Sequence, residues 1–354
     1  MTVAFAKPSA LSGSPHSGDD RHFMKDVIIT RTPLRISFAG GGTDLEDFSR
    51  EHGGAVLSTA IDKYVYVTVK RHSPLFNEPI RLNYSETELR SDLSEITNHI
   101  ARECLRLLEI EPPIYVSTVA DVPSHSGLGS SSSFAVGLLK ALHRLRGETV
   151  SAGQLAEEAC VVEITRLGKP IGRQDQFAAA YGGLNFIEFK QNNDVSVCGL
   201  SLSLSEMRRL FNHVMMFWTG MSRSSEDVLG EQRQRTAVNF EQLSRIRDQA
   251  SELHDILRHS FDPHRMGALL HEGWMAKRRL ASTISTTGID VWYDRARAAG
   301  ALGGKVCGAG GGGFLLFIVE PERQAAVHAA LSDLNYLSVG WEPKGATLLY
   351  PNGH

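Results

Sequence analysis

The sequence has few of the features that mark membrane proteins, nucleic-acid-binding proteins or disulfide-rich proteins. Its 354 residues contain no apolar run near the ~20 residues that a membrane helix needs, and the N-terminus has no apolar centre typical of a signal peptide. The 37 Lys and Arg residues against 40 Asp and Glu give a net charge of −3, so we expect no nucleic-acid and no membrane partner. Four cysteines stand far apart, which predicts reduced thiols in a cytoplasmic protein.

Length and composition are those of a globular protein. The chain is 42% hydrophobic and 22% charged, and its length corresponds to two domains at roughly 150 residues each. Strand-like and helix-like segments mix without regular βαβ alternation, which favours an α+β fold over a doubly wound sheet. We expect a disordered tail over residues 1–24, a first lobe over 25–205 and a second lobe over 206–354.

Glycine is in modest excess, with 33 copies that gather in clusters. The most informative cluster is Gly127-Leu-Gly129, followed by four serines that open an apolar helix predicted over 130–145. Such a turn exposes backbone N–H groups at the positive end of the helix dipole, and both favour phosphate. A serine N-cap after a surface loop is the simpler alternative, but two glycines and four serines in register favour a phosphate-binding loop. It is not a P-loop, because no GxxxxGK[ST] motif exists in the chain.

A second cluster contains a formal G-x-G-x-x-G at Gly308, Gly310 and Gly313. A dinucleotide fingerprint opens a helix, whereas the apolar residues that follow here predict a strand over 314–319. The nicotinamide-binding interpretation therefore fails on context. We expect instead a loop between two strands whose backbone lies against a ligand.

Three carboxylates stand near these segments, each with a plain structural alternative. Asp44 follows Gly40 to Gly42 at the end of a predicted strand and is equally suited to capping a helix. Asp175 lies in a predicted loop, where an aspartate is usually solvated or capping. Glu163 lies on a helix predicted over 151–167 and is by default a surface residue.

Taken together and in order, these segments resemble the GHMP kinases, the family of galactokinase, homoserine kinase, mevalonate kinase and phosphomevalonate kinase. The resemblance spans roughly residues 26 to 350. Three motifs carry it: Pro33-Leu-Arg35-Ile with Gly-Gly-Gly-Thr-Asp44, the Pro-x-x-x-Gly-Leu-Gly-Ser-Ser loop at 123 to 131, and the glycine run at 308 to 313. The form of the first motif is most similar to the branch that acts on D-glycero-D-manno-heptose 7-phosphate.

The resemblance implies a two-lobed α+β fold, with an N-terminal lobe like ribosomal protein S5 domain 2, a ferredoxin-like C-terminal lobe, and ATP between them. It also implies that Asp175 is the catalytic aspartate, that Arg35 orients it, and that Ser131 and Glu163 hold Mg²⁺. The implied nucleotide contacts are Pro123, Ser126, Gly127, Leu128, Gly129, Ser130, Ser131 and Ser132. The implied substrate contacts are Gly41, Gly42, Thr43, Asp44, Gly310 and Gly311.

The reaction implied is transfer of phosphate from ATP to the anomeric hydroxyl of the heptose 7-phosphate, giving the 1,7-bisphosphate. A 7-phosphate needs a cationic pocket, and Lys63, Arg173 and Arg223 are candidates by position, each equally well explained as a solvated surface cation. Two alternatives stay open: a kinase for an unphosphorylated sugar such as fucose or galactose, and a non-catalytic sugar-binding regulator of the same fold. The partner expected is a small sugar phosphate, and a homodimer is left open.

Overall fold

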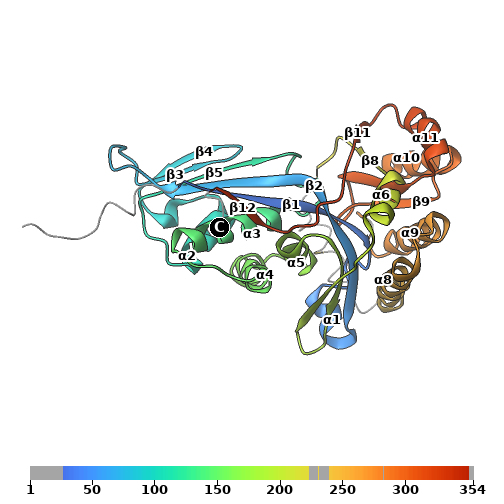
Figure 1. The fold of residues 1–354 in the computed structure, drawn as a ribbon, viewed down its shortest axis with the longest axis horizontal. Helices are drawn as coiled ribbons and strands as arrows, with labels where there is room; N and C mark the ends of the chain where they lie inside the picture. Colours follow the sequence, from blue (N-terminus) through green and yellow to red (C-terminus); the bar gives the residue numbers. More distant parts are fainter. Residues whose placement is uncertain (1–26, 223–229, 231–238, 282, 351–354) are drawn as a thin grey trace, which may run out of the picture.

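The computed structural model describes residues 27–222, 230, 239–281 and 283–350 (Figure 1). The tail expected over 1–24 lies outside the described residues. Helices and two separate β-sheets, one of eight strands and one of four, make up an α+β fold, as the sequence predicts. Within the described ranges, no helix combines the length and apolarity needed to span a membrane.

Two long strands form the centre of the larger sheet. β1 (Ile28–Ala39) and β2 (Gly54–Arg71) pair antiparallel. The register between them shifts between Pro33 and Leu34, at a proline that cannot donate to the ladder. The other strands are β3 (Ile80–Asn83), β4 (Thr87–Arg90), β5 (Ile114–Ala120), β6 (Leu184–Phe189), β7 (Val195–Gly199) and β12 (Thr347–Tyr350).

The order of this sheet is β12-β1-β2-β5-β3-β4, and β6 and β7 extend it along the first half of β2. The final strand, expected in the second lobe, therefore pairs with β1 in the sheet of the first lobe. This placement corrects the expected boundary, because the residues after the second lobe return to the first.

Helix α3 (Ser130–Leu145) begins and ends where the sequence predicts and packs on β1 and β2. Gly137 allows the close approach, since a Cβ there would lie 2.6 Å from Thr32 Oγ1. Thr30 Oγ1 donates to the Gly137 carbonyl at 2.9 Å. The middle of α3 is thereby fixed against β1. The same face of the sheet carries α2 (His99–Leu107), α4 (Ala152–Cys160) and α5 (Gln174–Tyr181) (Figure 1).

The smaller sheet lies at the other end of the molecule (Figure 1). Its order is β11-β8-β10-β9, with β8 (Val214–Trp218) and β10 (Phe314–Ile318) at its centre. Alternate residues of β8 enter different cores: Met216 packs in the core shared with the first lobe, and Phe217 in the core of the second. The edge strands of this sheet are β9 (Gly303–Val306) and β11 (Asn335–Leu337). The helices of the second lobe are α8 (Phe240–His259), α9 (Pro263–Lys277), α10 (Thr287–Ala298) and α11 (Gln324–Ala330).

Two further helices, α1 (Glu46–His52) and α6 (Leu204–Asn212), complete the elements that the argument needs. Helix α8 is described from Phe240, and residues 223–229 and 231–238 before it lie outside the described ranges. Asp262 caps α9 through the N–H groups of His264 and Arg265, with Pro263 at the first helical position.

Candidate active site

A cavity of about 540 Å³ opens between the phosphate-loop region of the first lobe and the glycine loop of the second. Its wall brings together most of the residues that the sequence singles out. Those that line it are Arg35, Gly41, Gly42, Asp44, Gly127, Gly129, Ser130, Ser131, Ser132, Glu163, Asp175 and Gly310.

The loop before α3 is built for close approach of its backbone. Gly127 and Gly129 have φ values of +84° and +78°, in the left-handed region that glycine adopts without strain. Gly129 is the N-cap of α3, and the first turn of the helix directs free N–H groups toward the cavity. Together with the hydroxyls of Ser130 to Ser132, this end of the cavity is suited to a polyphosphate.

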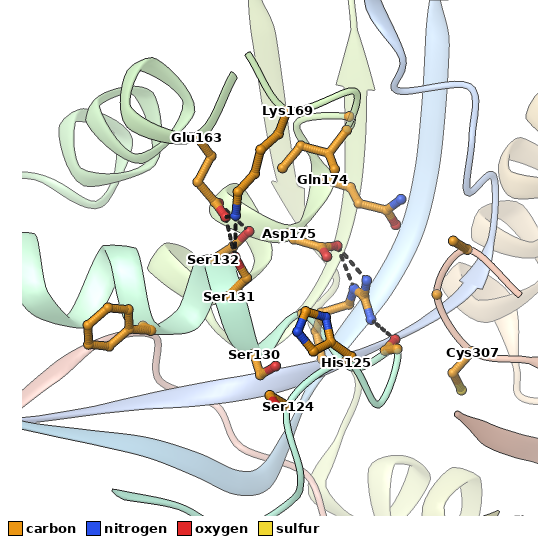
Figure 2. Close-up of a pocket in the computed structure, with 18 of the residues that line it drawn as sticks. Ser124, His125, Ser130, Ser131, Ser132, Glu163, Lys169, Gln174, Asp175 and Cys307 are labelled. Atoms are coloured by element: carbon orange, nitrogen blue, oxygen red, sulfur yellow. Dashed lines mark hydrogen bonds and ion pairs between the residues drawn. The ribbon is translucent and has the colours of Figure 1, made fainter. Parts of the chain in front are cut away.

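Arg35 and Asp175 form an ion pair at the cavity (Figure 2). The guanidinium donates to Asp175 Oδ1 from Nε at 2.7 Å and from Nη2 at 2.6 Å. Its Nη1 donates to the Gly127 carbonyl at 2.7 Å. Arg35 is only 4% exposed in its side chain, so it ties the carboxylate to the phosphate loop in a single rigid arrangement.

Glu163 lies in a π-helical segment, Val161–Arg166, that continues α4 where the sequence predicts a regular helix. It is fully buried, not a surface glutamate. Its carboxylate accepts from Ser131, from Ser132 Oγ at 2.6 Å and from Gln176 Nε2 at 2.8 Å. The extra residue of a π-bulge is often found at functional sites, and here it turns the carboxylate toward the loop.

Lys169 completes this cluster (Figure 2). Its ammonium donates to Ser131 Oγ at 3.0 Å and to Glu163 Oε1 at 3.2 Å. The cluster therefore offers one carboxylate and two hydroxyls as oxygen donors. Among the described residues, no group of three or more His, Cys, Asp or Glu side chains is arranged to hold a metal ion.

Asp44 is nearly fully buried at the edge of the cavity and does not cap α1, the helix that follows it, through its side chain. Its carboxylate accepts from Gly42 N at 2.9 Å, Gln174 N at 3.1 Å and Gln174 Nε2 at 3.1 Å. Burial raises the pKa of Asp44 above its ordinary value, and the charge of Asp175 adds to this, while the backbone donors oppose it.

The glycine run joins β9 to β10, so the expected strand-to-strand loop is confirmed. Its backbone lies first against the phosphate loop. A Cβ on Gly308 would lie 2.6 Å from Gly127 Cα, and one on Gly313 would lie 2.5 Å from the Ser126 carbonyl oxygen. Gly310 lines the cavity, whereas Gly311 does not and donates its N–H to Ile284 O at 2.8 Å.

Four other predicted site residues lie beside the cavity without lining it. Thr43 is buried and donates to the Gly40 carbonyl at 2.8 Å, so it shapes the turn that carries Asp44. Leu128 is in the core, and its carbonyl accepts from Arg35 N at 3.1 Å. Pro123 and Ser126 belong to the same loop, and Ser126 is fully buried.

The expected phosphate-binding cations do not meet in the cavity. Lys63 pairs with Asp62 at 2.9 Å and lies outside the lining. Arg173 donates to both Glu157 oxygens, at 2.7 and 2.6 Å, and also lies outside it. Arg223 lies outside the described residues. The geometry thus gives Lys63 and Arg173 roles as surface ion pairs.

The sequence did not single out Lys169, Gln174 or Lys277, all of which line the cavity. Gln174 is adjacent to Asp175, so the motif itself could have drawn attention to it. Lys277, at the end of α9, and Lys169 carry no local signal, because nothing in their neighbourhood distinguishes them from solvated cations. The far end of the cavity is less polar and is lined by Val65, Tyr84, Asn98, Ile100, Thr118, Val122 and Phe134.

Comparison with known proteins identifies the family. Residues 94–183 match the GHMP kinases N terminal domain, and residues 250–337 match the GHMP kinases C terminal domain. The chain is 30% identical over 321 residues to the D-glycero-alpha-D-manno-heptose 7-phosphate kinase of Campylobacter jejuni, covering 86% of this chain and 93% of that protein. The chain is a GHMP kinase.

Other relatives of this GHMP kinase carry different names. It is 25% identical to the L-fucokinase/L-fucose-1-P guanylyltransferase of Bacteroides fragilis, over 86% of this chain and 36% of that larger protein. The crystal structure of a D-glycero-D-manno-heptose 1-phosphate kinase from Bacteroides thetaiotaomicron superposes with a TM-score of 0.75 at 27% identity, covering 92% of this chain and all of the other. Family membership makes the protein an ATP-dependent phosphotransferase that acts on a hydroxyl group.

Proposed function

We propose that this GHMP kinase transfers phosphate from ATP to the anomeric hydroxyl of D-glycero-D-manno-heptose 7-phosphate, giving the 1,7-bisphosphate. The observation that carries the proposal is the Arg35–Asp175 pair, which shares one cavity with the phosphate loop. The name of the Campylobacter jejuni relative supports a heptose phosphate as the acceptor.

Asp175 is suited to accept the proton of the attacking hydroxyl. Both contacts from Arg35 go to Oδ1. The other oxygen, Oδ2, lies over the phosphate loop, 3.3 Å from where a Cβ on Gly129 would be. A hydroxyl hydrogen-bonded to Oδ2 would face the terminal phosphate. As its oxygen bonds to phosphorus, the bond to ADP breaks and the proton passes to Oδ2.

The phosphate loop and the start of α3 would hold the triphosphate through backbone N–H groups and serine hydroxyls. Mg²⁺, which neutralises phosphate charge when bound, would be held by Ser131 and Glu163. The residues fit such an ion, because Mg²⁺ prefers oxygen and commonly takes only one or two protein ligands beside phosphate and water. Lys169 already donates to both residues, so on binding of the ion its ammonium would either move away from these oxygens or share them with the ion.

Asp44, with Gly41 and Gly42, would bind hydroxyls of the sugar ring. The carboxylate is held in place by Gln174, the neighbour of Asp175, so the sugar-binding and proton-accepting groups are fixed relative to each other. A carboxylate that accepts bidentate contacts from vicinal hydroxyls gives orientation as well as affinity.

The experiment is a kinase assay with the purified protein over a panel of heptose 7-phosphate, unphosphorylated heptose, fucose and galactose, with the product position read by phosphorus NMR. We expect a new anomeric phosphate on the heptose 7-phosphate and the highest kcat/KM for it. A preference for a free sugar would support the fucokinase-like alternative, which the Bacteroides fragilis relative favours. Sugar binding without turnover would support a non-catalytic regulator.

We further propose that the enzyme works in the cytoplasm, where ATP is available and where its four cysteines, with Cys104, Cys160 and Cys307 buried, would stay reduced. Whether it forms a homodimer is decided by light scattering on the purified protein.

A further inference from the structure

Lys277 is a buried cation that lines the cavity, and its ammonium has hydrogen-bond donors without a partner among the described residues. It is the last residue of α9 in the second lobe and is 6% exposed. Its ammonium donates to the Gly308 carbonyl at 2.5 Å. That is its one hydrogen bond among the described residues, whereas an ammonium carries three donors. Two donors therefore remain at the wall of the active-site cavity.

The other two Lys and Arg side chains in the described lining are more fully engaged. Arg35 bonds to Asp175 and to the Gly127 carbonyl. Lys169 bonds to Ser131 and Glu163. Lys277 is thus the one cation of the three whose protein partner is neutral.

The charge of Lys277 is poorly compensated by protein. Asp44 and Asp175 are near enough to favour its charged form, but among the described residues neither forms a hydrogen bond or ion pair with it, since their oxygens accept from Gln174, Gly42 and Arg35. Burial outweighs these carboxylates and lowers the pKa of Lys277 to about 8. A buried cation without a contacting anion is costly, and an anionic ligand would remove that cost.

The position of Lys277 indicates which part of a ligand it would meet. Its partner, Gly308, packs directly on Gly127 of the phosphate loop. Asp175, which pairs with Arg35, also lines the cavity. The ammonium therefore lies on the second-lobe side of the point where the phosphate loop and the acceptor-binding carboxylates converge.

We propose that Lys277 donates hydrogen bonds to a phosphoryl oxygen of the bound substrates, supplied either by the terminal phosphate of the nucleotide or by the phosphate of the sugar. This proposal rests on the kinase activity proposed above but does not depend on the sugar being a heptose. Phosphoryl oxygens carry the charge that a compact ammonium binds best, and the second lobe would then contribute a side chain as well as backbone to catalysis.

The first experiment compares Lys277→Met and Lys277→Arg with the parent by steady-state kinetics. Lys305→Met is the matched control. Lys305 is equally buried, but its ammonium is bonded to the Ser37 and Phe38 carbonyls, at 2.8 and 3.2 Å, and it does not line the cavity. This control therefore removes a buried lysine of the same lobe without touching the lining.

The two phosphoryl sources give different results. If Lys277 binds the transferring phosphate, kcat of Lys277→Met falls by about 100-fold, both KM values change little, and Lys277→Arg restores part of the rate. If it binds the phosphate of the sugar, KM for the sugar phosphate rises by about 10-fold or more while turnover of the unphosphorylated sugar is unchanged. Parent-like kinetics of Lys277→Met, or losses no larger than those of Lys305→Met, would overturn the proposal.

A second experiment needs no variant and covers the case in which Lys277→Met does not fold. The parent enzyme is treated with pyridoxal 5′-phosphate near pH 8, and the imine, formed with loss of water, is reduced with borohydride and located by mass spectrometry. We expect labelling at Lys277, protected by ATP or by the sugar phosphate, and none at Lys305. Absence of label at Lys277, or label that neither ligand reduces, would contradict the proposal. Protection by ATP is measured without any sugar, so failure here is distinct from failure to turn over heptose 7-phosphate.

Discussion

Arg35 bonds to one oxygen of Asp175 and leaves the other facing the loop before α3. Nε and Nη2 of Arg35 lie 2.7 and 2.6 Å from Oδ1, while Oδ2 lies beside Gly129 at the start of α3. The arginine therefore orients the carboxylate without consuming the oxygen that faces the phosphate loop. The same guanidinium bonds to the Gly127 carbonyl, so loop and carboxylate move as one unit.

Replacing Asp175 with Asn should remove the proton acceptor while keeping its shape. We expect kcat to fall by about 10²- to 10⁴-fold, the range typical of a lost general base, with KM for ATP changed little. ADP release in a coupled assay measures this. Asp194→Asn, in the exposed turn between β6 and β7, is the control and should retain parent activity. Turnover of Asp175→Asn within a few-fold of the parent would show that another group accepts the proton.

Replacing Glu163 with Gln should weaken the magnesium dependence of the reaction. We expect the Mg²⁺ concentration for half-maximal rate to rise by about 10-fold or more, because a neutral amide is a poorer ligand than a carboxylate. Titrating Mg²⁺ at saturating ATP measures the change.

Glu157→Gln is the matched control for that measurement, because Glu157 pairs with Arg173 outside the cavity. An unchanged Mg²⁺ dependence in Glu163→Gln would mean that the carboxylate serves only to position the serines. Loss of the charge also removes the carboxylate that pairs with Lys169, so thermal stability should be recorded for both variants.

Gly308→Ala should push the glycine run at 308–313 away from the loop that contains Gly127. Both Gly308 and Gly147 have positive φ, +71° and +79°, so alanine is strained at either by roughly 1–2 kcal/mol. Only at Gly308 would the new Cβ also meet backbone, 2.6 Å from Gly127 Cα, whereas at Gly147 nothing lies within 4 Å. We expect Gly308→Ala to lower Tm clearly more than Gly147→Ala and also to reduce kcat/KM. Equal Tm losses would mean that the contact between the loops yields easily.

Stability should rise with pH between about 7 and 8.5 because of Lys305. Burial lowers the pKa of Lys305 to about 7 in the folded protein, against 10.5 when exposed. In this interval the unfolded chain binds a proton that the folded chain has released, so raising the pH favours folding, by up to about 1.4 kcal/mol per pH unit. The window ends below the ordinary thiol pKa of 9.0, which burial raises for Cys307.

Urea unfolding of the parent and of Lys305→Met across this window tests the effect. The parent should gain free energy of unfolding as the pH rises, and the variant should gain less. Lys277 contributes in the same direction at the upper end of the window, because its folded pKa is about 8. A flat or falling profile in the parent would show that Lys305 stays charged in the fold.

The sequence predicts well those features that depend on neighbouring residues. Helix α3 begins at Ser130 because a glycine in the left-handed region precedes it. The glycine run is followed by a strand because the apolar segment after it is short and continuous. The family resemblance rests on these local motifs, and the matched domains confirm it.

Features that depend on the packing of distant segments cannot be predicted from neighbouring residues. Asp175 was expected in a loop but lies in the first turn of α5, since no capping side chain announces that helix. Lys63 and Arg173 look like candidates because they are near motifs in sequence, yet the fold pairs each with an acidic neighbour outside the cavity. Lys277 reaches the cavity only because α9 packs on β9, which no local pattern records.

The return of the chain to its first sheet has a mechanical consequence. Because β12 pairs with β1, the second lobe is inserted into the sequence of the first, and two chain segments connect the lobes instead of one. The outgoing connection leads into β8, and the returning one is bonded where Glu342 N donates to Ala60 O and Ala346 N to Ala179 O. The second lobe is therefore held at both ends of its sequence and also through the hydrophobic core that Met216 shares with the first lobe. Loss of β12 would leave that side of β1 without a strand partner, as an exposed sheet edge.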